Sequence, residues 1–245
     1  PTLASSTKNF LPVPFLGAYL ALMGVAAAGM FCMSRVHFPV PLDTLSAAGT
    51  QPSRTALQLL SQPGFAVAAL CAASSYGVMN LLMAATPIAM DVCGYEFADA
   101  AFVLQWHVVG MFAPGFITGH LIKRFGVLTI MGVGVAINLL CVGIALSGQS
   151  VAHFAWALTL LGVGWNFLFT GSTSLAMDHY RPEEKDRAQG VINFCVFAAM
   201  AMTSFASGAL VTSEGWSMLN QGSLPMLALT AIALLAVARP RLMKT

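Results

Sequence analysis

Charge is scarce in this chain. Among its 245 residues there are 9 Asp and Glu and 11 Lys and Arg, so 8% of the residues are charged and 58% are hydrophobic. Soluble domains carry about a quarter charged residues, and a chain with so few cannot face water on all sides. The composition excludes an ordinary soluble domain and predicts an all-α polytopic membrane protein. The basic residues come singly or in pairs, so no nucleic-acid partner is expected.

Motifs for metals, nucleotides and hydrolytic chemistry are also lacking. The five cysteines are scattered without a C-x-x-C spacing, so neither a disulfide framework nor a metal site is predicted. No G-x-x-x-x-G-K-[ST] run is present, which argues against ATP-driven transport within this chain. An H-E-x-x-H pattern, a Ser/His pair and paired Asp residues inside the spans are absent too. We therefore expect no enzyme and no cofactor.

Long apolar segments are what the chain does have. Each approaches the roughly 20 residues that a helix needs to cross the hydrocarbon core of a bilayer. Pro87 and Pro114 lie late in two of them, where neighbouring helices tolerate a kink. The predicted spans are seven: 13–33, 65–87, 100–121, 127–147, 151–174, 190–212 and 222–238.

The connections predict the topology. The linker 34–63 is long and holds five of the Pro and Gly residues, whereas the other connections are short. When alternate connections are placed on the same side, Lys8 falls on one side and the other ten basic residues fall on the opposite side. Because basic residues concentrate in cytoplasmic loops, the C-terminus is predicted to be cytoplasmic and the start of the chain to be outside.

The turn GHLIKRFG, from Gly119 to Gly126, resembles the short loop motif of the major facilitator superfamily of secondary transporters. That motif reads roughly G-x-L-x-D-R-x-G-R-K and lies between the second and third helices of each six-helix half. Gly119, Leu121, Arg124 and Gly126 match it, while Lys123 stands where the motif has Asp.

A second stretch carries the same resemblance. The sequence DHYRPEEKDRAQGVINF, residues 178–194, is similar to the cytoplasmic loop between the tenth and eleventh helices of many bacterial members. The preceding GVGWNFLFTGSTSL, residues 162–175, resembles their tenth helix. Together the two stretches and the loop motif relate nearly the whole chain to this family.

The resemblance implies an arrangement of the chain. Residues 1–33 are the last helix of the N-terminal half, 34–63 are the central cytoplasmic linker, and 64–245 are the C-terminal half, built of two three-helix repeats. The other helices of the N-terminal half are then missing from the chain as given. The expected function is secondary transport of a small organic solute across the inner membrane by alternating access, with the bilayer, that solute and the missing helices as partners.

Polar and aromatic residues inside the spans are the candidates for a substrate cavity, because burying polar groups in lipid is costly. Tyr76 and Asn80 share a helical face, and Trp165 lies beside the polar face of Asn166 and Thr170. Each could line a cavity, or could make a hydrogen bond between helices, for which Asn is well suited. Both interpretations stay open at this point.

His107 is the titratable side chain that lies well inside a span, and it shares a helical face with Met111. Histidine has an unperturbed pKa of about 6.5, which suits a coupling proton. The alternative is a neutral histidine that donates a hydrogen bond to a neighbouring helix. His107 and Met111 complete the set of cavity candidates.

Charged residues of the cytoplasmic loops are candidates for a gate, or they merely orient the loops. They are Arg181, Glu184 and Arg187, together with Lys123 and Arg124 of the loop motif. The competing hypothesis is a seven-helix receptor or another membrane protein that is not a transporter. A retinal protein is disfavoured, because residues 222–238 contain no Lys.

Overall fold

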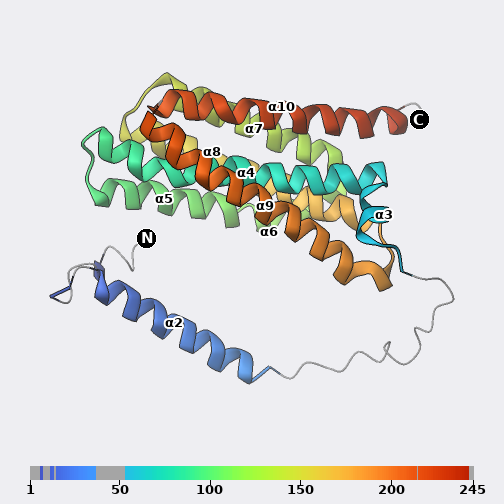
Figure 1. The fold of residues 1–245 in the computed structure, drawn as a ribbon, viewed down its shortest axis with the longest axis horizontal. Helices are drawn as coiled ribbons and strands as arrows, with labels where there is room; N and C mark the ends of the chain where they lie inside the picture. The colour runs from blue at the N-terminus through green and yellow to red at the C-terminus, as the bar shows by residue number, and fades with distance from the viewer. Residues whose placement is uncertain (1–5, 8–11, 14, 37–52, 214, 243–245) are drawn as a thin grey trace. The chain divides into compact units, whose positions relative to one another are not determined.

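The structure, a computed structural model, describes residues 6–7, 12–13, 15–36, 53–213 and 215–242. Lys8, Glu214, Lys244 and most of the predicted linker therefore lie outside the described residues. The part of the chain that is described is helical and holds no strand (Figure 1). It divides into two compact units, Pro1–Pro52 and Ser53–Thr245. Each unit is described by itself.

The first unit contains helix α2, Leu16–Ser34. Its 19 residues are apolar all round, and in length and hydropathy they fit one membrane crossing. The helix coincides with the predicted span 13–33 to within a few residues.

The second unit begins with Ser53 and Arg54, which lead into a short helix. Thr55 caps that helix by accepting a hydrogen bond from the backbone N–H of Gln58, whose side chain in turn accepts from the N–H of Thr55. The elements that follow are α3 Ala56–Leu60, α4 Pro63–Val92, α5 Phe97–Phe112, α6 Gly115–Phe125, α7 Val127–Ser147, α8 Val151–Met177, the 3₁₀ turn η2 Pro182–Glu184, α9 Lys185–Ser213 and α10 Gly215–Leu242.

The described helices confirm an all-α polytopic membrane protein. Six are long and apolar enough to cross a membrane, and the bent pair α5 and α6 adds a seventh span when it is counted as one. The helices of the spans 65–87 and 190–212 extend up to five residues further, and two other spans differ more from the structure. The span 100–121 is broken at Ala113 and Pro114 with a bend of 40°. The last helix begins at Gly215, not at 222, because the polar side chains of Asn220 and Ser223 are satisfied by carbonyls of the same helix and do not end it.

The two predicted repeats are interlocked. The first comprises α4, α5–α6 and α7, and the second comprises α8, α9 and α10. Helix α5 packs against α8, and α9 packs against α4, so the middle helix of each repeat lies on the first helix of the other (Figure 1). Helices α4 and α8 contact each other and thus form the centre of the unit.

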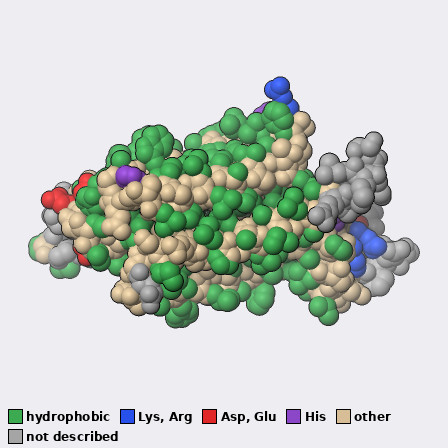
Figure 2. Space-filling view, turned by 90° about the horizontal axis from the view of Figure 1, so that it is seen from above, with side chains coloured by type: hydrophobic (Ala, Val, Ile, Leu, Met, Phe, Trp, Pro, Cys, Tyr) green, Lys and Arg blue, Asp and Glu red, His purple; other side chains and the backbone are tan. Residues whose placement is uncertain are grey.

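The buried side chains fall into two apolar clusters with polar groups near the middle of the helices. One cluster includes Phe154 and Trp216, and the other includes Phe65 and Leu175. Asn80, Asn138 and Asn166 lie near the middle of α4, α7 and α8, and each is less than a tenth exposed. Figure 2 shows apolar side chains spread along the whole flank between the two ends, and acidic side chains at one end.

Candidate functional site

The break between α5 and α6 is the irregular backbone nearest the candidate residues. Helix α5 ends at Phe112, and α6 begins at Gly115 after Pro114. Proline has no backbone N–H and its ring clashes with the carbonyl four residues earlier, so it bends or ends a helix. The kink expected at Pro114 is present, and it separates α5 from α6 within the same predicted span.

Asn166 of α8 bridges this break. Its Nδ2 donates to the carbonyl of Met111 at 2.7 Å, on the α5 side. The hydroxyl of Thr118, on the α6 side, lies 2.7 Å from Asn166 Oδ1 and 2.8 Å from the carbonyl of Pro114. Thr118 has one hydroxyl hydrogen, which it shares between these two acceptors. The amide of Asn166 is therefore already engaged by protein groups.

Asn80 of α4 is engaged in a similar way. Its Nδ2 lies 3.1 Å from the carbonyl of Met200 and from the hydroxyl of Thr203, and 2.8 Å from the hydroxyl of Ser204, all on α9. Ser207 of α9 donates to the carbonyl of Leu81 at 2.9 Å. These contacts hold α4 and α9 together, and they favour the interpretation of Asn80 as a link between helices.

Four aromatic rings gather beside Asn166. Trp165 stacks on Phe169 with ring centroids 5.4 Å apart and an interplanar angle of 14°. Tyr76 meets Trp165 and Phe169 edge-on at 5.1 and 4.9 Å, and Phe112 lies 6.4 Å from Trp165. We call these four residues the aromatic cluster.

The aromatic cluster has a buried centre and an open rim. Trp165 is 6% exposed, whereas Tyr76 and Phe169 are partly exposed and Phe112 is 63% exposed. The indole Nε1 of Trp165 has no hydrogen-bond partner among the described residues. A buried N–H is usually paired, so this donor is available to an acceptor that the described chain does not supply.

His107 lies between α5 and α8 and is fully buried. Its Nδ1 is 2.7 Å from the carbonyl of Leu158; because a carbonyl only accepts, Nδ1 carries the hydrogen. The Nε2 atom has no partner in the described part of the chain. This is the geometry expected of a neutral histidine that links two helices.

Glycine brings α5 and α8 close together at this level. A Cβ added to Gly162 would lie 2.5 Å from the carbonyl oxygen of His107 and 2.7 Å from the backbone nitrogen of Met111. A Cβ added to Gly110 would collide with the carbonyl oxygen of Thr159. The two backbones are thus in direct contact, as small residues at helix interfaces in membranes allow.

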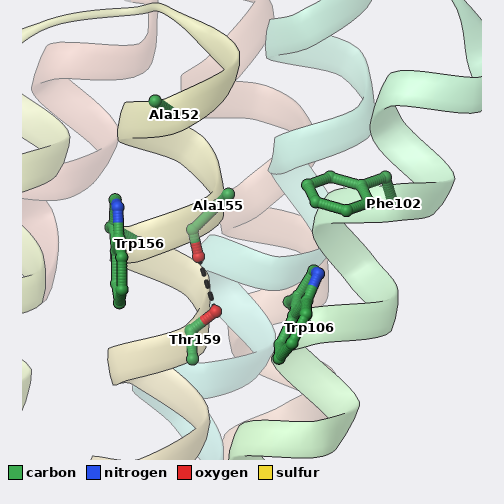
Figure 3. A pocket seen from close by; sticks show the side chains of 6 residues that line it. All are labelled: Phe102, Trp106, Ala152, Ala155, Trp156 and Thr159. Carbon is green, nitrogen blue, oxygen red and sulfur yellow. Dashed lines mark hydrogen bonds between the residues drawn. The ribbon is translucent and has the colours of Figure 1, made fainter.

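A groove lies between the same two helices, towards the beginning of α8 (Figure 3). It has a volume of about 370 Å³ and is lined by Phe102, Trp106, Ala152, Ala155, Trp156 and Thr159. The hydroxyl of Thr159 already donates to the carbonyl of Ala155 at 2.7 Å. The groove therefore offers little to orient a polar solute, and we do not assign the solute to it.

The loop motif forms the end of α6 and the start of α7. Gly126 joins the two helices with φ of 85°, a left-handed value that favours glycine. Lys123 and Arg124 are exposed in the last turn of α6, where the helix dipole favours positive charge. The guanidinium of Arg124 lies 5.2 Å from the ring centroid of Phe125.

The turn between α8 and α9 holds a buried carboxylate. The side chain of Glu184 is 1% exposed and is bonded by both Nε and Nη2 of Arg54, with Nε at 2.8 Å. The backbone N–H groups of Arg54 and Arg181 also donate to it, at 3.0 and 2.9 Å. The side-chain hydrogen bond to Glu184 raises the pKa of Arg54.

Arg187 strengthens the same turn, because its guanidinium donates to the carbonyls of Ser53 and Arg54. The residues just before α3 are thereby tied to the α8–α9 turn. Arg181 contributes its backbone, while its side chain is exposed. Glu184 and Arg187, predicted as gate residues, thus bind the end of the linker region.

The structure brings some of the candidate residues together and separates others. Tyr76 and Trp165 meet in the aromatic cluster, and Met111 and Asn166 meet at the break. Thr170 lies about 140° around α8 from Trp165, so it does not face the aromatic cluster.

Sequence reasoning missed three participants. Arg54 was counted among the basic loop residues, although the capping box that follows it marks a fixed position. Phe112 and Phe169 were overlooked; the spacing of Phe169 four residues after Trp165 was the available signal.

The fold and this arrangement define a polytopic helical membrane protein with a broken span and a polar middle layer. The family model of the Major Facilitator Superfamily matches residues 10–204 and again 68–245. The chain belongs to this family of transporters, so the receptor and enzyme alternatives are set aside. No solved structure matches the chain.

Curated relatives agree with this assignment. The chain is 36% identical to the riboflavin transporter RfnT of Brucella anthropi over 244 residues, which is 98% of this chain and 61% of that protein. It is 27% identical over 215 residues to YdeG, an MFS-type transporter of Bacillus subtilis, covering 84% of this chain and 50% of YdeG. The chain thus spans between half and two thirds of these relatives' length.

Proposed function

We propose that the protein to which this chain belongs is a secondary transporter of a small, planar, heteroaromatic solute, of which riboflavin is the first to test. Residues 64–245 form its C-terminal half, and the solute crosses by alternating access between this half and the N-terminal one. The relationship to a riboflavin transporter over 98% of the chain supports the choice of solute class.

The aromatic cluster is the observation that carries the proposal. Flat ring systems bind well against Trp, Tyr and Phe in stacked or edge-on arrangements. Tyr76, Trp165, Phe169 and Phe112 come from three different helices and lie near the middle of α4 and α8, the level at which such transporters bind solute. The unpaired indole N–H of Trp165 would donate to a carbonyl or ring nitrogen of the solute.

The remaining candidates are assigned around this cluster. Met111 directly precedes Phe112 in the sequence and accepts from Asn166 with its backbone carbonyl, and the amides of Asn80 and Asn166 are occupied by such helix contacts. Glu184, Arg187 and Arg54 form the cytoplasmic anchor of the linker region, with Arg181 at its rim. A coupling proton is part of the proposal; the hydrogen bond of His107 to the carbonyl of Leu158 favours a neutral link between helices over a proton carrier, and the His107 variants of the Discussion test this.

Location and orientation belong to the proposal as well. We place the protein in the cell (inner) membrane with the C-terminus and the α8–α9 turn in the cytoplasm, because basic residues concentrate on that side. Cys93, exposed between α4 and α5, should then react with an impermeant maleimide added outside intact cells. A cysteine at Lys185 should react in inverted vesicles alone; labelling of both from the same side would contradict this topology.

Uptake by the full-length protein tests the function. Proteoliposomes should accumulate labelled riboflavin above protein-free liposomes, and a panel of other ring systems should compete. Trp165→Ala should raise KM about tenfold, which corresponds to about 1.4 kcal/mol of lost contact. Trp156→Ala is the matched control, because that tryptophan is 64% exposed and lies outside the aromatic cluster. No uptake of riboflavin or of any competitor by folded protein would refute the proposal.

A further inference from the structure

We propose that the break between α5 and α6 is a hinge of the transport cycle, and that Asn166 is the positioning residue that sets its resting angle. This inference rests on the proposed transport function and adds a moving part to it. It assigns Asn166 to the protein's own conformational change, in place of contact with solute.

The backbone at the break needs a partner from outside. In an unbroken helix the carbonyl of Met111 would accept from the N–H of the residue four positions on, which is Gly115. Here α5 has ended at Phe112, and Asn166 Nδ2 donates to that carbonyl at 2.7 Å. In the membrane interior no water replaces a lost donor, so the bend is stable only while such a partner is in place.

The same side chain reaches the other arm. Asn166 Oδ1 accepts from Thr118 in α6, one turn after the proline. Asn166 is 6% exposed and Thr118 is fully buried, so solvent does not compete for either group. One amide therefore touches both sides of the bend, and the angle between the arms depends on its position.

The two arms are held with different firmness. Helix α5 is in backbone contact with α8 at Gly110 and Gly162. Helix α6 has no such approach at either of its glycines: a Cβ added to Gly115 would lie 3.5 Å from Asn166 Nδ2, an ordinary contact with a side chain, and one added to Gly119 would meet no atom within 4 Å. We infer that α5 stays with α8 while α6 pivots, carrying Lys123 and Arg124 at its cytoplasmic end.

The experiment uses the full-length protein with its native cysteines replaced and spin labels at Phe102 and Phe125, which are 49% and 52% exposed on the two arms. Asn166→Ala should broaden the distance distribution between the labels. It should also lower riboflavin turnover about three- to tenfold, the effect of losing hydrogen bonds between helices, and leave KM within about twofold. Thr118→Val should act in the same way, and Thr118→Ser should restore the wild-type values.

Ser172→Ala is the control. Ser172 is buried in α8 like Asn166, but its hydroxyl donates at 2.6 Å to Leu168 of its own helix and bridges nothing. It should change neither distances nor turnover. If Asn166→Ala does not fold, the distance distribution and the turnover of Thr118→Val decide the test.

Two results would overturn the inference. A raised KM with unchanged turnover and an unchanged distance distribution would make Asn166 a ligand of the solute. Distances and kinetics that both match the wild type would make the break a static bend. The proposed function fails separately, if wild-type protein takes up no solute, and the distance measurements then still decide whether Asn166 holds the hinge.

Discussion

The middle helices of the two repeats, α5–α6 and α9, are anchored in the same way and yet differ in continuity. Asn166 donates to the carbonyl of Met111 in one repeat, and Asn80 donates to the carbonyl of Met200 in the other. Helix α9 runs unbroken from Lys185 to Ser213, whereas α5–α6 bends at Pro114. Asn80 joins two continuous helices and so fixes the contact between them. Asn166 bridges a proline break and, in our proposal, sets the angle between its two arms.

The backbone contacts of the two pairs differ as well. A Cβ on Gly162 of α8 would collide with backbone atoms of α5. A Cβ on Gly77 of α4 would meet the Met226 side-chain end at 2.5 Å, and the α9 side chains Thr203 and Ala199 at 3.5 and 3.7 Å. The broken helix therefore comes closer to its partner's backbone at Gly162 than the continuous helix does at Gly77.

The most severe test introduces a break into α9. Met202→Pro should remove one backbone hydrogen bond and cost about 3 kcal/mol or more, because α9 has no partner arranged for the freed carbonyl. Met202 is 72% exposed, so Met202→Ala is a control without lost packing. The folded yield and the thermal midpoint should both fall for the proline variant. A normal midpoint would mean that α9 tolerates a break as α5–α6 does.

The glycines provide a smaller test. Gly162→Ala should destabilise the protein by about 1–3 kcal/mol, since backbone must move to accept the methyl group. Gly77→Ala should cost less, because the nearest atom is the end of a flexible methionine. Thermal unfolding in detergent measures both. Equal losses in the two variants would show that the contacts are alike.

The sequence was informative about what local chemistry controls. Runs of apolar residues predicted the spans, and the missing N–H of proline predicted the bend at Pro114. The sequence did not show which residues the buried polar side chains contact. Whether Asn80 and Asn166 faced a cavity or a helix depended on residues more than 40 positions away, and the same amide suits both roles.

The contacts of Glu184 show the same limit. Glu184 was predicted as a residue that forms a gate or orients its loop, and the structure buries it against Arg54, 130 residues earlier. The sequence shows that Glu184 follows Pro182 at a helix start, but it does not show that Arg54 is its partner, because that contact forms only when the helices pack.

The α6–α7 and α8–α9 turns extend the comparison between repeats. Glu184→Ala should lower the thermal midpoint by several degrees, because it leaves Arg54 without its carboxylate and frees two backbone N–H groups. Lys123→Ala should change it by about a degree or less, since that side chain is exposed at the end of α6. The exchange Arg54→Glu with Glu184→Arg should recover part of the loss. An equal effect of the two alanine variants would contradict this assignment.

Substitution of His107 is expected to change transport least. It also tests a residue by which α5 differs from α9. Counted from the anchoring methionines, Val196 of α9 stands where His107 stands in α5, so the second repeat does without a titratable group there. His107 donates to Leu158 and is sealed between α5 and α8. We therefore expect His107→Asn, which keeps a donor at the position of Nδ1, to leave the pH profile of riboflavin uptake unchanged between about pH 5.5 and 7.5.

His107→Leu should lower the thermal midpoint and keep the same profile in the protein that folds, because the histidine then contributes packing and one hydrogen bond. A histidine that carries the coupling proton would behave otherwise. Both variants would lose the pH dependence and the accumulation driven by a proton gradient, while exchange of solute at equal pH would persist. The shape of the pH profile, measured on folded protein, thus separates the two roles. His107 is either a contact between helices, which α9 makes with a valine at this position, or a proton carrier that the broken helix alone contains.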